Sequence, residues 1–226
     1  MLDIDENILL DLSWAHLLTR INRCLLHDFS NQIAGILALS ELYCSYPQSD
    51  SIKEGLLSIK NNGLKGRDLL HVLSQLNRPS YQDTYIDLYK FLKDLESVFL
   101  SILPSNINFK LNIPQELIVK SSTFYLLQIF FQLLYNASDA LKTHTKPQLT
   151  IDCSIHNQNI LCIIQDNGCG YYPHEPIQTY FKKKDAEHLG LGLYSVQKCL
   201  ERIQGQLSFT QTTPGTCIQL TFPRAS

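Results

Sequence analysis

A carboxylate and several glycines gather at the end of an apolar run in the second half of the chain. Asp166 ends the run, Gly168 and Gly170 follow it at once, and Gly190 and Gly192 open a helical apolar pattern further along. A carboxylate can read a base by accepting a hydrogen bond, and glycine lets the backbone pass close to a base or a phosphate. The spacing predicts a nucleotide pocket, although Asp-Asn-Gly is also an ordinary turn string after a strand.

A second reactive group lies near the N-terminus, where His27 and Asp28 are adjacent and Asn31 follows. A neutral imidazole nitrogen can attack phosphorus, and a neighbouring carboxylate can take or orient the ring proton. Asn31 lies one helical turn after His27 and on the same face. His27 also stands off the apolar stripe of its helix, as a reactive side chain should, but taken alone it also fits an ordinary surface histidine.

Two further residues have side chains suited to metal or phosphate. Asn136 lies inside a helical pattern, where asparagine is a mediocre residue unless something uses it. Its amide oxygen is the kind of ligand that Mg²⁺ prefers. Lys184 ends a run of three lysines, for which a solvated charged surface is the alternative interpretation.

The N-terminal part of the chain is predicted to be a helical hairpin. Apolar residues recur at intervals of three and four over 9–43 and again over 51–76, with a turn at 45–50. Two such helices cannot bury both of their apolar faces alone, which predicts a dimeric four-helix bundle. The segment 77–80 is the expected domain boundary.

Beyond that boundary the pattern predicts an α+β sandwich, with helices on one face of a mixed sheet. The expected strands are 85–88, 106–112, 149–155, 160–166, 206–212 and 216–222, and the expected helices are 89–103, 122–141 and 192–203.

Composition narrows the class of protein. The chain has 226 residues and a net charge of -2, which argues against a nucleic-acid partner held by phosphate neutralisation. Its apolar stretches fall short of the roughly 20 residues that a membrane span needs, and the acidic N-terminus does not resemble a signal peptide. None of the seven cysteines forms a C-x-x-C pair, so neither a zinc site nor a disulfide framework is expected. These features predict a reduced, cytoplasmic protein.

Together the motifs resemble the catalytic core of bacterial two-component sensor histidine kinases, over about residues 15–223. The resemblance implies a dimerisation and histidine phosphoacceptor domain over 1–78 and an ATPase domain of the Bergerat type over 79–226. It implies ATP and Mg²⁺ as substrate and cofactor. His27 would accept the phosphoryl group and pass it to an aspartate of a response-regulator receiver domain, while Asp28 and Asn31 would also serve dephosphorylation of that partner.

The resemblance also assigns roles within the ATPase domain. Asn136 would bind Mg²⁺, and Asp166 would accept a hydrogen bond from the adenine amino group. Gly168 and Gly170 would lie at the base, and Lys184, Gly190 and Gly192 would lie near the phosphates. The chain departs from the family at Gln132, where a second asparagine is usual, and in its short lid over 185–189.

Two other classes of protein remain open. One is a dimeric histidine phosphotransferase or scaffold with a kinase-like fold, which would receive phosphate on His27 from another protein. The other is a Bergerat-fold ATPase of the anti-sigma Ser/Thr kinase kind, against which the long N-terminal hairpin speaks. Sensory input is expected to come from an unidentified partner, from the short N-terminal extension or from a region outside this sequence.

Overall fold

The computed structural model describes residues 6–45, 54–63, 66, 80–170, 191–211 and 214–225. The chain divides into two compact units, each described here by itself. One unit is Leu18–Arg78, and the other joins Met1–Leu17 to Pro79–Ser226. One break between the units therefore lies at the expected boundary, and the other lies within the first helix.

The smaller unit contains most of helix α1 (Glu6–Ser45) and the helical residues 54–63. A Cβ on Gly35 would lie 3.1 Å from Asn62 Nδ2, and a Cβ on Gly66 would lie 3.7 Å from Phe29 Cε2. Phe29 thus lies near Gly66, and the later residue Gly35 lies near the earlier residue Asn62, so the two stretches run antiparallel. These contacts agree with the expected hairpin, whereas the dimeric bundle stays a prediction.

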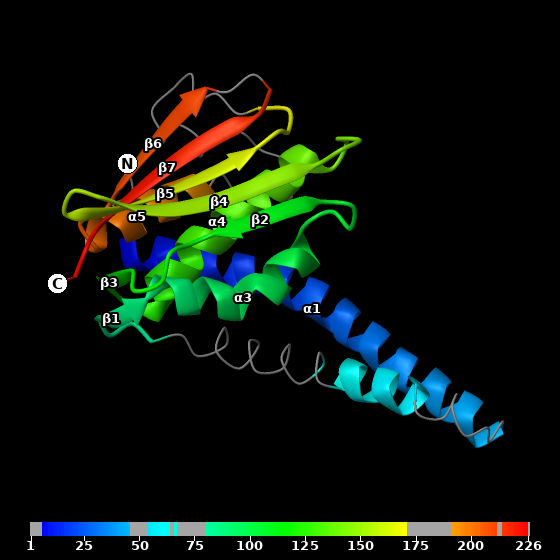
Figure 1. Ribbon diagram of the computed structural model, residues 1–226. Coiled ribbons are helices and arrows are strands. Elements are labelled where there is room, and N and C mark those ends of the chain that lie inside the picture. The colour runs from blue at the N-terminus through cyan, green and yellow to red at the C-terminus, as the bar shows by residue number, and fades with distance from the viewer. Residues whose placement is uncertain are drawn as a thin grey trace. The chain divides into compact units, whose positions relative to one another are not determined.

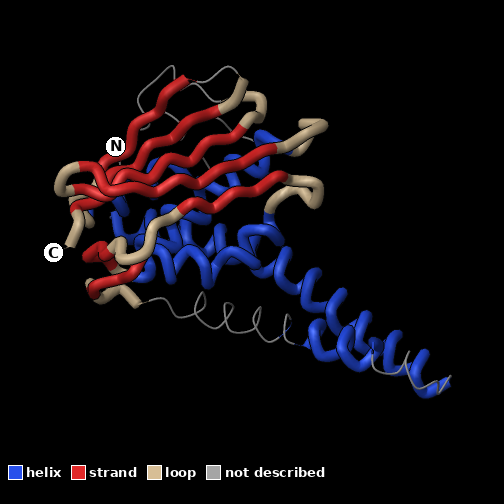
Figure 2. The backbone as a smooth tube through the Cα atoms, in the orientation of Figure 1, coloured by secondary structure: helices blue, strands red, loops and turns tan. Residues whose placement is uncertain are grey.

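The larger unit is built on a five-stranded sheet with the order β2-β4-β5-β7-β6 (Figures 1 and 2). Its strands are β2 (Asn108–Asn112), β4 (Gln148–His156), β5 (Asn159–Asp166), β6 (Gln206–Gln211) and β7 (Thr216–Pro223). β2 and β4 are parallel and the other neighbours are antiparallel. The prediction of a mixed sheet is confirmed.

Three helices cover one face of this sheet: α3 (Leu88–Ile102), α4 (Thr123–Leu141) and α5 (Leu191–Arg202) (Figure 1). The strands bury alternate residues, as a sheet covered on one face requires; in β5 the buried positions are Ile160, Cys162, Ile164 and Asp166. Helix α4 is buried along most of its length, which explains its nearly continuous apolar sequence. The helix begins where Ser122 accepts a hydrogen bond from Tyr125 N at 3.2 Å.

A separate two-stranded antiparallel sheet pairs β1 (Thr84–Asp87) with β3 (Ile118–Ser121). The sequence pattern did not predict β3, because its four residues, Ile-Val-Lys-Ser, do not alternate between apolar and polar side chains. Asp87 then caps α3, accepting hydrogen bonds from Tyr89 N at 3.0 Å and Lys90 N at 3.3 Å.

The first turns of α1 belong to the larger unit. Leu10, Trp14 and Leu17 follow the helical spacing and are buried there. The ring of Trp14 meets that of Phe124, at the start of α4, edge to face with a centroid distance of 5.5 Å. Within the described ranges, no helix combines the length and apolar character needed to cross a membrane.

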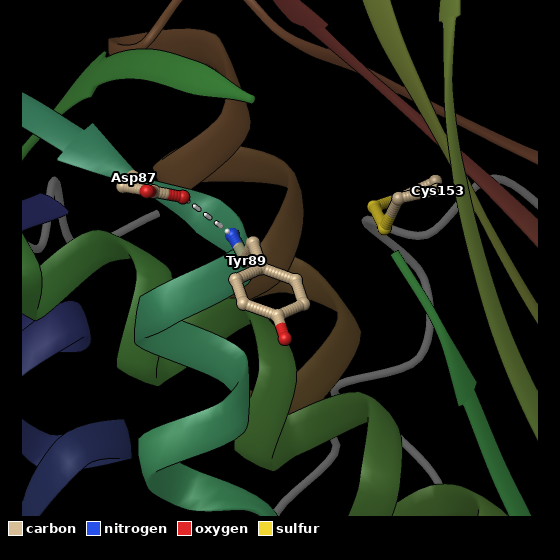
Figure 3. The surroundings of a disulfide bond; sticks show 4 residues. Asp87, Tyr89 and Cys153 are labelled. Atoms are coloured by element: carbon tan, nitrogen blue, oxygen red, sulfur yellow. Dashed lines mark hydrogen bonds between the residues drawn. A yellow bond between two sulfur atoms is a disulfide. The ribbon is translucent and has the colours of Figure 1, made fainter. Parts of the chain in front are cut away.

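The prediction that the cysteines are reduced and that no disulfide forms is wrong at one pair. Cys153 on β4 and Cys162 on β5 form a disulfide, with Cα atoms 4.3 Å apart (Figure 3). The same view includes the cap of α3, where Asp87 accepts the hydrogen bond from Tyr89 N. The tight turn at 157–158 sets a register that places the two cysteines directly opposite each other. A search for C-x-x-C spacing cannot detect a pair that is joined across a hairpin.

Candidate functional site

Asp166 is the buried acidic residue at the end of β5. The strand register places it between Leu149 of β4 and Thr216 of β7, and its side chain is only 6% exposed. Its Oδ1 accepts a hydrogen bond from Gly168 N at 2.8 Å. The turn that follows the strand therefore holds the carboxylate in one orientation.

The environment of Asp166 disfavours its charge. Burial raises the pKa of the carboxyl above its ordinary value, while hydrogen bonds from Gly168 and from the backbone and hydroxyl of Thr216 act in the opposite direction. None of the described lysines, arginines or histidines forms an ion pair with it. A buried carboxylate without a cation is costly to the fold, which favours a role in binding or catalysis.

The glycines beside Asp166 are required by close packing. A Cβ on Gly168 would lie 2.7 Å from the carbonyl oxygen of Ala140, near the end of α4. Gly170 has a φ of +78° and Gly215, in the β6–β7 turn, has a φ of +106°, which side-chain-bearing residues rarely adopt. The loop after β5 is thus seated between α4 and that turn.

Two residues that support this site were not singled out from the sequence. Asn167 Oδ1 accepts a hydrogen bond from Gln148 N at 2.8 Å, and its Nδ2 donates to Lys146 O at 3.0 Å. Asn167 therefore ties the loop to the start of β4. Thr216, which bonds Asp166, faces it through the β5–β7 register. The Asp-Asn-Gly turn string is a sequence signal for Asn167, but no local pattern identifies Thr216 as a neighbour of Asp166.

Two polar residues of α4 have different surroundings. Asn136 is half-buried, so its amide remains partly accessible. Gln132, one turn earlier, is buried, and its Nε2 donates to Ser13 Oγ of α1 at 3.1 Å. Gly192, at the start of α5, packs against the same side chain, since a Cβ there would lie 2.8 Å from Gln132 Oε1. The amide of Gln132 is therefore engaged inside the protein.

Three of the predicted features lie outside the described residues. They are Lys184, Gly190 and the lid at 185–189. The described part of the site therefore consists of the loop after β5, the β6–β7 turn, α4 and the start of α5.

The second reactive group lies in the helical unit, on α1. His27 is exposed, with 74% of its side chain accessible. Its Nδ1 is 3.3 Å from Asp28 Oδ1 and 3.3 Å from Asn31 Nδ2. Both contacts that described residues make with the ring thus involve Nδ1, which donates to Asp28 when it carries the proton and accepts from Asn31 Nδ2 when it does not. When Nδ1 carries the proton and donates it to Asp28, Nε2 has a free lone pair and is nucleophilic.

Comparison with known proteins places the larger unit in a known structural class. Residues 123–226 match the family model described as histidine kinase-, DNA gyrase B-, and HSP90-like ATPase. This segment runs from the start of α4 to the end of the chain, so it contains Asn136, Asp166 and all the described glycines of the site.

Similar solved structures include sensor histidine kinases. A mycobacterial sensor histidine kinase, MprB, has a TM-score of 0.53 at 21% identity, covering 63% of this chain and 98% of that chain. The catalytic domain of histidine kinase ThkA has a TM-score of 0.54 at 18% identity, covering 64% and 99%. The Acinetobacter baumannii histidine kinase AdeS covers 90% of this chain and 97% of its own, at 17% identity and a TM-score of 0.52. At these identities the likeness establishes the fold.

Proposed function

We propose that this chain is a protein histidine kinase core, because residues 123–226 match the model of the histidine kinase-, DNA gyrase B-, and HSP90-like ATPase family. It binds ATP with Mg²⁺, phosphorylates His27 and passes the phosphoryl group to an aspartate of a response-regulator receiver domain. The observation that carries this proposal is the buried carboxylate of Asp166, which is fixed by Gly168 and Thr216 and forms no ion pair with a described residue.

Asp166 suits recognition of adenine. A carboxylate oxygen accepts a hydrogen bond from an exocyclic amino group, and burial strengthens that bond by excluding water. Since the ionised form is costly without a partner, a ligand that donates to it relieves part of that cost. Asn136, half-buried on α4, supplies an oxygen ligand of the kind that Mg²⁺ takes, and the ion would neutralise charge on the phosphates.

His27 suits phosphoryl acceptance. With Nδ1–H donated to Asp28, the Nε2 lone pair forms the bond to the γ-phosphorus, the bond to the bridging oxygen of the β-phosphate breaks, and ADP leaves. The charge that develops on the ring is stabilised by the Asp28 carboxylate. Asn31 Nδ2 can donate to the same nitrogen only in the other tautomer, so we assign Asn31 to the separate reaction, in which its amide would position a water for dephosphorylation of the partner.

A homodimer is part of the proposal. Leu26, Ile33 and Leu37 of α1 are all more than 40% exposed. They recur at intervals of seven and four, so they form one apolar stripe on the helical unit. Pairing of two such stripes would complete a four-helix bundle. Light scattering should give twice the chain mass, and Leu37→Glu should shift the protein toward the monomer; a wild-type monomer would refute this part.

One observation favours a second candidate, a histidine phosphotransferase or scaffold with a kinase-like fold. Gln132, where the resemblance implies a second asparagine, donates to Ser13 instead. A site that has lost one polar contact to the nucleotide could have lost catalysis while keeping the phosphoacceptor histidine.

Labelling with γ-labelled ATP and Mg²⁺ separates the two candidates. The wild type should acquire acid-labile label, and His27→Ala and Asp166→Ala should abolish it. His156→Ala is the matched control, because it removes another exposed histidine, on β4. Nucleotide binding without labelling would refute autokinase activity. Failure to bind nucleotide, together with acceptance of phosphate from a phosphorylated receiver domain, would favour the phosphotransferase.

A further inference from the structure

The first turns of α1 are docked on the ATPase core, although they precede the matched segment by more than 100 residues of chain. Trp14 and Leu17 are buried there, and Leu10 is 4% exposed. Two polar contacts flank these apolar ones: Gln128 Nε2 donates to Leu10 O at 3.4 Å, and Arg202 Nη2 donates to Asn7 Oδ1 at 2.9 Å. The docked segment therefore reaches both α4 and α5.

A directed chain of hydrogen bonds crosses the centre of this contact. Gln132 Nε2 donates to Ser13 Oγ at 3.1 Å, Ser13 Oγ donates to Ser195 Oγ at 3.1 Å, and Ser195 Oγ donates to Gly192 O at 2.7 Å. Ser13, Gln132 and Ser195 are all at most 7% exposed. Each hydroxyl has a single proton, which these bonds use, so removal of Ser13 would take away the acceptor of the buried Gln132 Nε2 on α4 and the donor to Ser195 Oγ on α5, which would keep only its bond to Gly192 O.

The chain of bonds ends at the first turn of α5. Gly192 is the second residue of that helix, and Gln132 Oε1 occupies the space where a Cβ at position 192 would stand. The amides at a helix N-terminus attract phosphate, and the family match puts this turn inside the ATPase core. The position of α1 is thus linked by three hydrogen bonds to the turn on which the nucleotide phosphates would rest.

We propose that Ser13, Gln132 and Ser195 are positioning residues that couple docking of the first turns of α1 to nucleotide binding, with Gln132 serving α1 instead of Mg²⁺. The inference rests on the proposed function, since it assumes a nucleotide at this site. Docked α1 holds the first turn of α5 in its binding geometry. Because such coupling is reciprocal, bound nucleotide also holds α1 in place, and displacement of α1 weakens nucleotide binding.

Trp14 makes the docking measurable. It is the only tryptophan of the chain and lies inside the docked segment. Acrylamide quenching of its fluorescence therefore reports docking, and calorimetric titration with Mg-ADP reports affinity. The variants are Ser13→Ala, Ser195→Ala and Gln132→Met, with far-UV circular dichroism to confirm folding. Ser101→Ala is the matched control, because that serine lies on α3 and, among the described residues, its hydroxyl bonds within its own helix, to Ser97 O.

In the wild type, Mg-ADP should reduce quenching of Trp14. Ser13→Ala should increase quenching in the absence of nucleotide and weaken Mg-ADP binding by about tenfold, within the usual range for coupled sites. Ser13→Ala/Gln132→Met should be no weaker than the single variants, because both remove one chain of bonds. Ser101→Ala should match the wild type.

The possible failures are distinct. A wild type that binds Mg-ADP, with Ser13→Ala binding equally well, would refute the coupling and leave the proposed function intact. Fully additive losses in the double variant would also refute it. A wild type that binds no nucleotide would refute the proposed function and the coupling together.

Discussion

Gly215 is the position where one added methyl group should disturb both the fold and the pocket. Its φ is +106°, and a Cβ there would overlap the carbonyl oxygen of Asp166 and lie 2.8 Å from Cα of Asn167. Both neighbours are backbone atoms, so neither can rotate away. In Gly215→Ala the β6–β7 turn must move off the end of β5, and the carboxylate of Asp166 must move with the strand.

The size of the effect follows from two terms. A left-handed backbone costs an L-residue about 1–2 kcal/mol, and an overpacked methyl typically costs about 1–3 kcal/mol. Together they predict a loss of about 2–5 kcal/mol from the free energy of unfolding, against a total of about 5–15 kcal/mol for a typical domain. Mg-ADP affinity should fall as well, since the hydrogen bond that we propose Asp166 accepts from the base depends on the same turn.

Urea denaturation followed by Trp14 fluorescence measures this loss in the unit that contains the site. Gly63→Ala is the control, because that glycine is helical and a Cβ there would meet no atom within 4 Å. It should leave the Trp14 transition unchanged or stabilise the protein by less than about 1 kcal/mol. If Gly215→Ala unfolded at the same urea concentration as the wild type, with unchanged affinity, the packing argument would be refuted.

Four further predictions concern three side chains, Asp166, Asp28 and Asp87. Burial raises the pKa of Asp166 above 3.8. On acidification, Mg-ADP affinity should therefore begin to fall at a higher pH than it would with an exposed aspartate. The ratio of wild-type to Asp166→Asn affinity at each pH should separate this effect from titration of the nucleotide. The free energy of unfolding should change with pH in the opposite direction. The protonated Asp166 carboxyl stabilises the fold fully below pH 3.8, and this stabilisation is lost as pH rises through the raised pKa. Urea midpoints of the wild type and Asp166→Asn, measured over a series of pH values, should show this loss. Asp28→Asn should slow labelling of His27 by about 10²-fold with Mg-ADP affinity unchanged, and an equal rate would exclude a role in proton handling. Asp87→Ala, which removes the cap bonds to Tyr89 N and Lys90 N, should lower the urea-derived stability by about 1 kcal/mol.

Much of the fold could be predicted because its elements are long and periodic. The apolar residues of α4 and the alternation of β5 give clear patterns, and both elements lie within a residue or two of the expected ranges. Strand β3 was missed because it is stabilised by pairing with β1, some thirty residues earlier in the chain. The Cys153–Cys162 disulfide was missed because it depends on register across a hairpin, and spacing motifs carry no information on register.

The sequence by itself indicated which chemistry to propose for the chain. An acidic residue followed by glycines, and a histidine followed by an acid, can be recognised without the fold, because their groups are neighbours along the backbone. Only the tertiary structure decided which distant polar residues lie together. Ser13, Gln132 and Ser195 are far apart in the chain, and they form one buried network because α1, α4 and α5 pack together. Burial makes those hydrogen bonds costly to lose, and it arises from packing that no short segment of sequence contains.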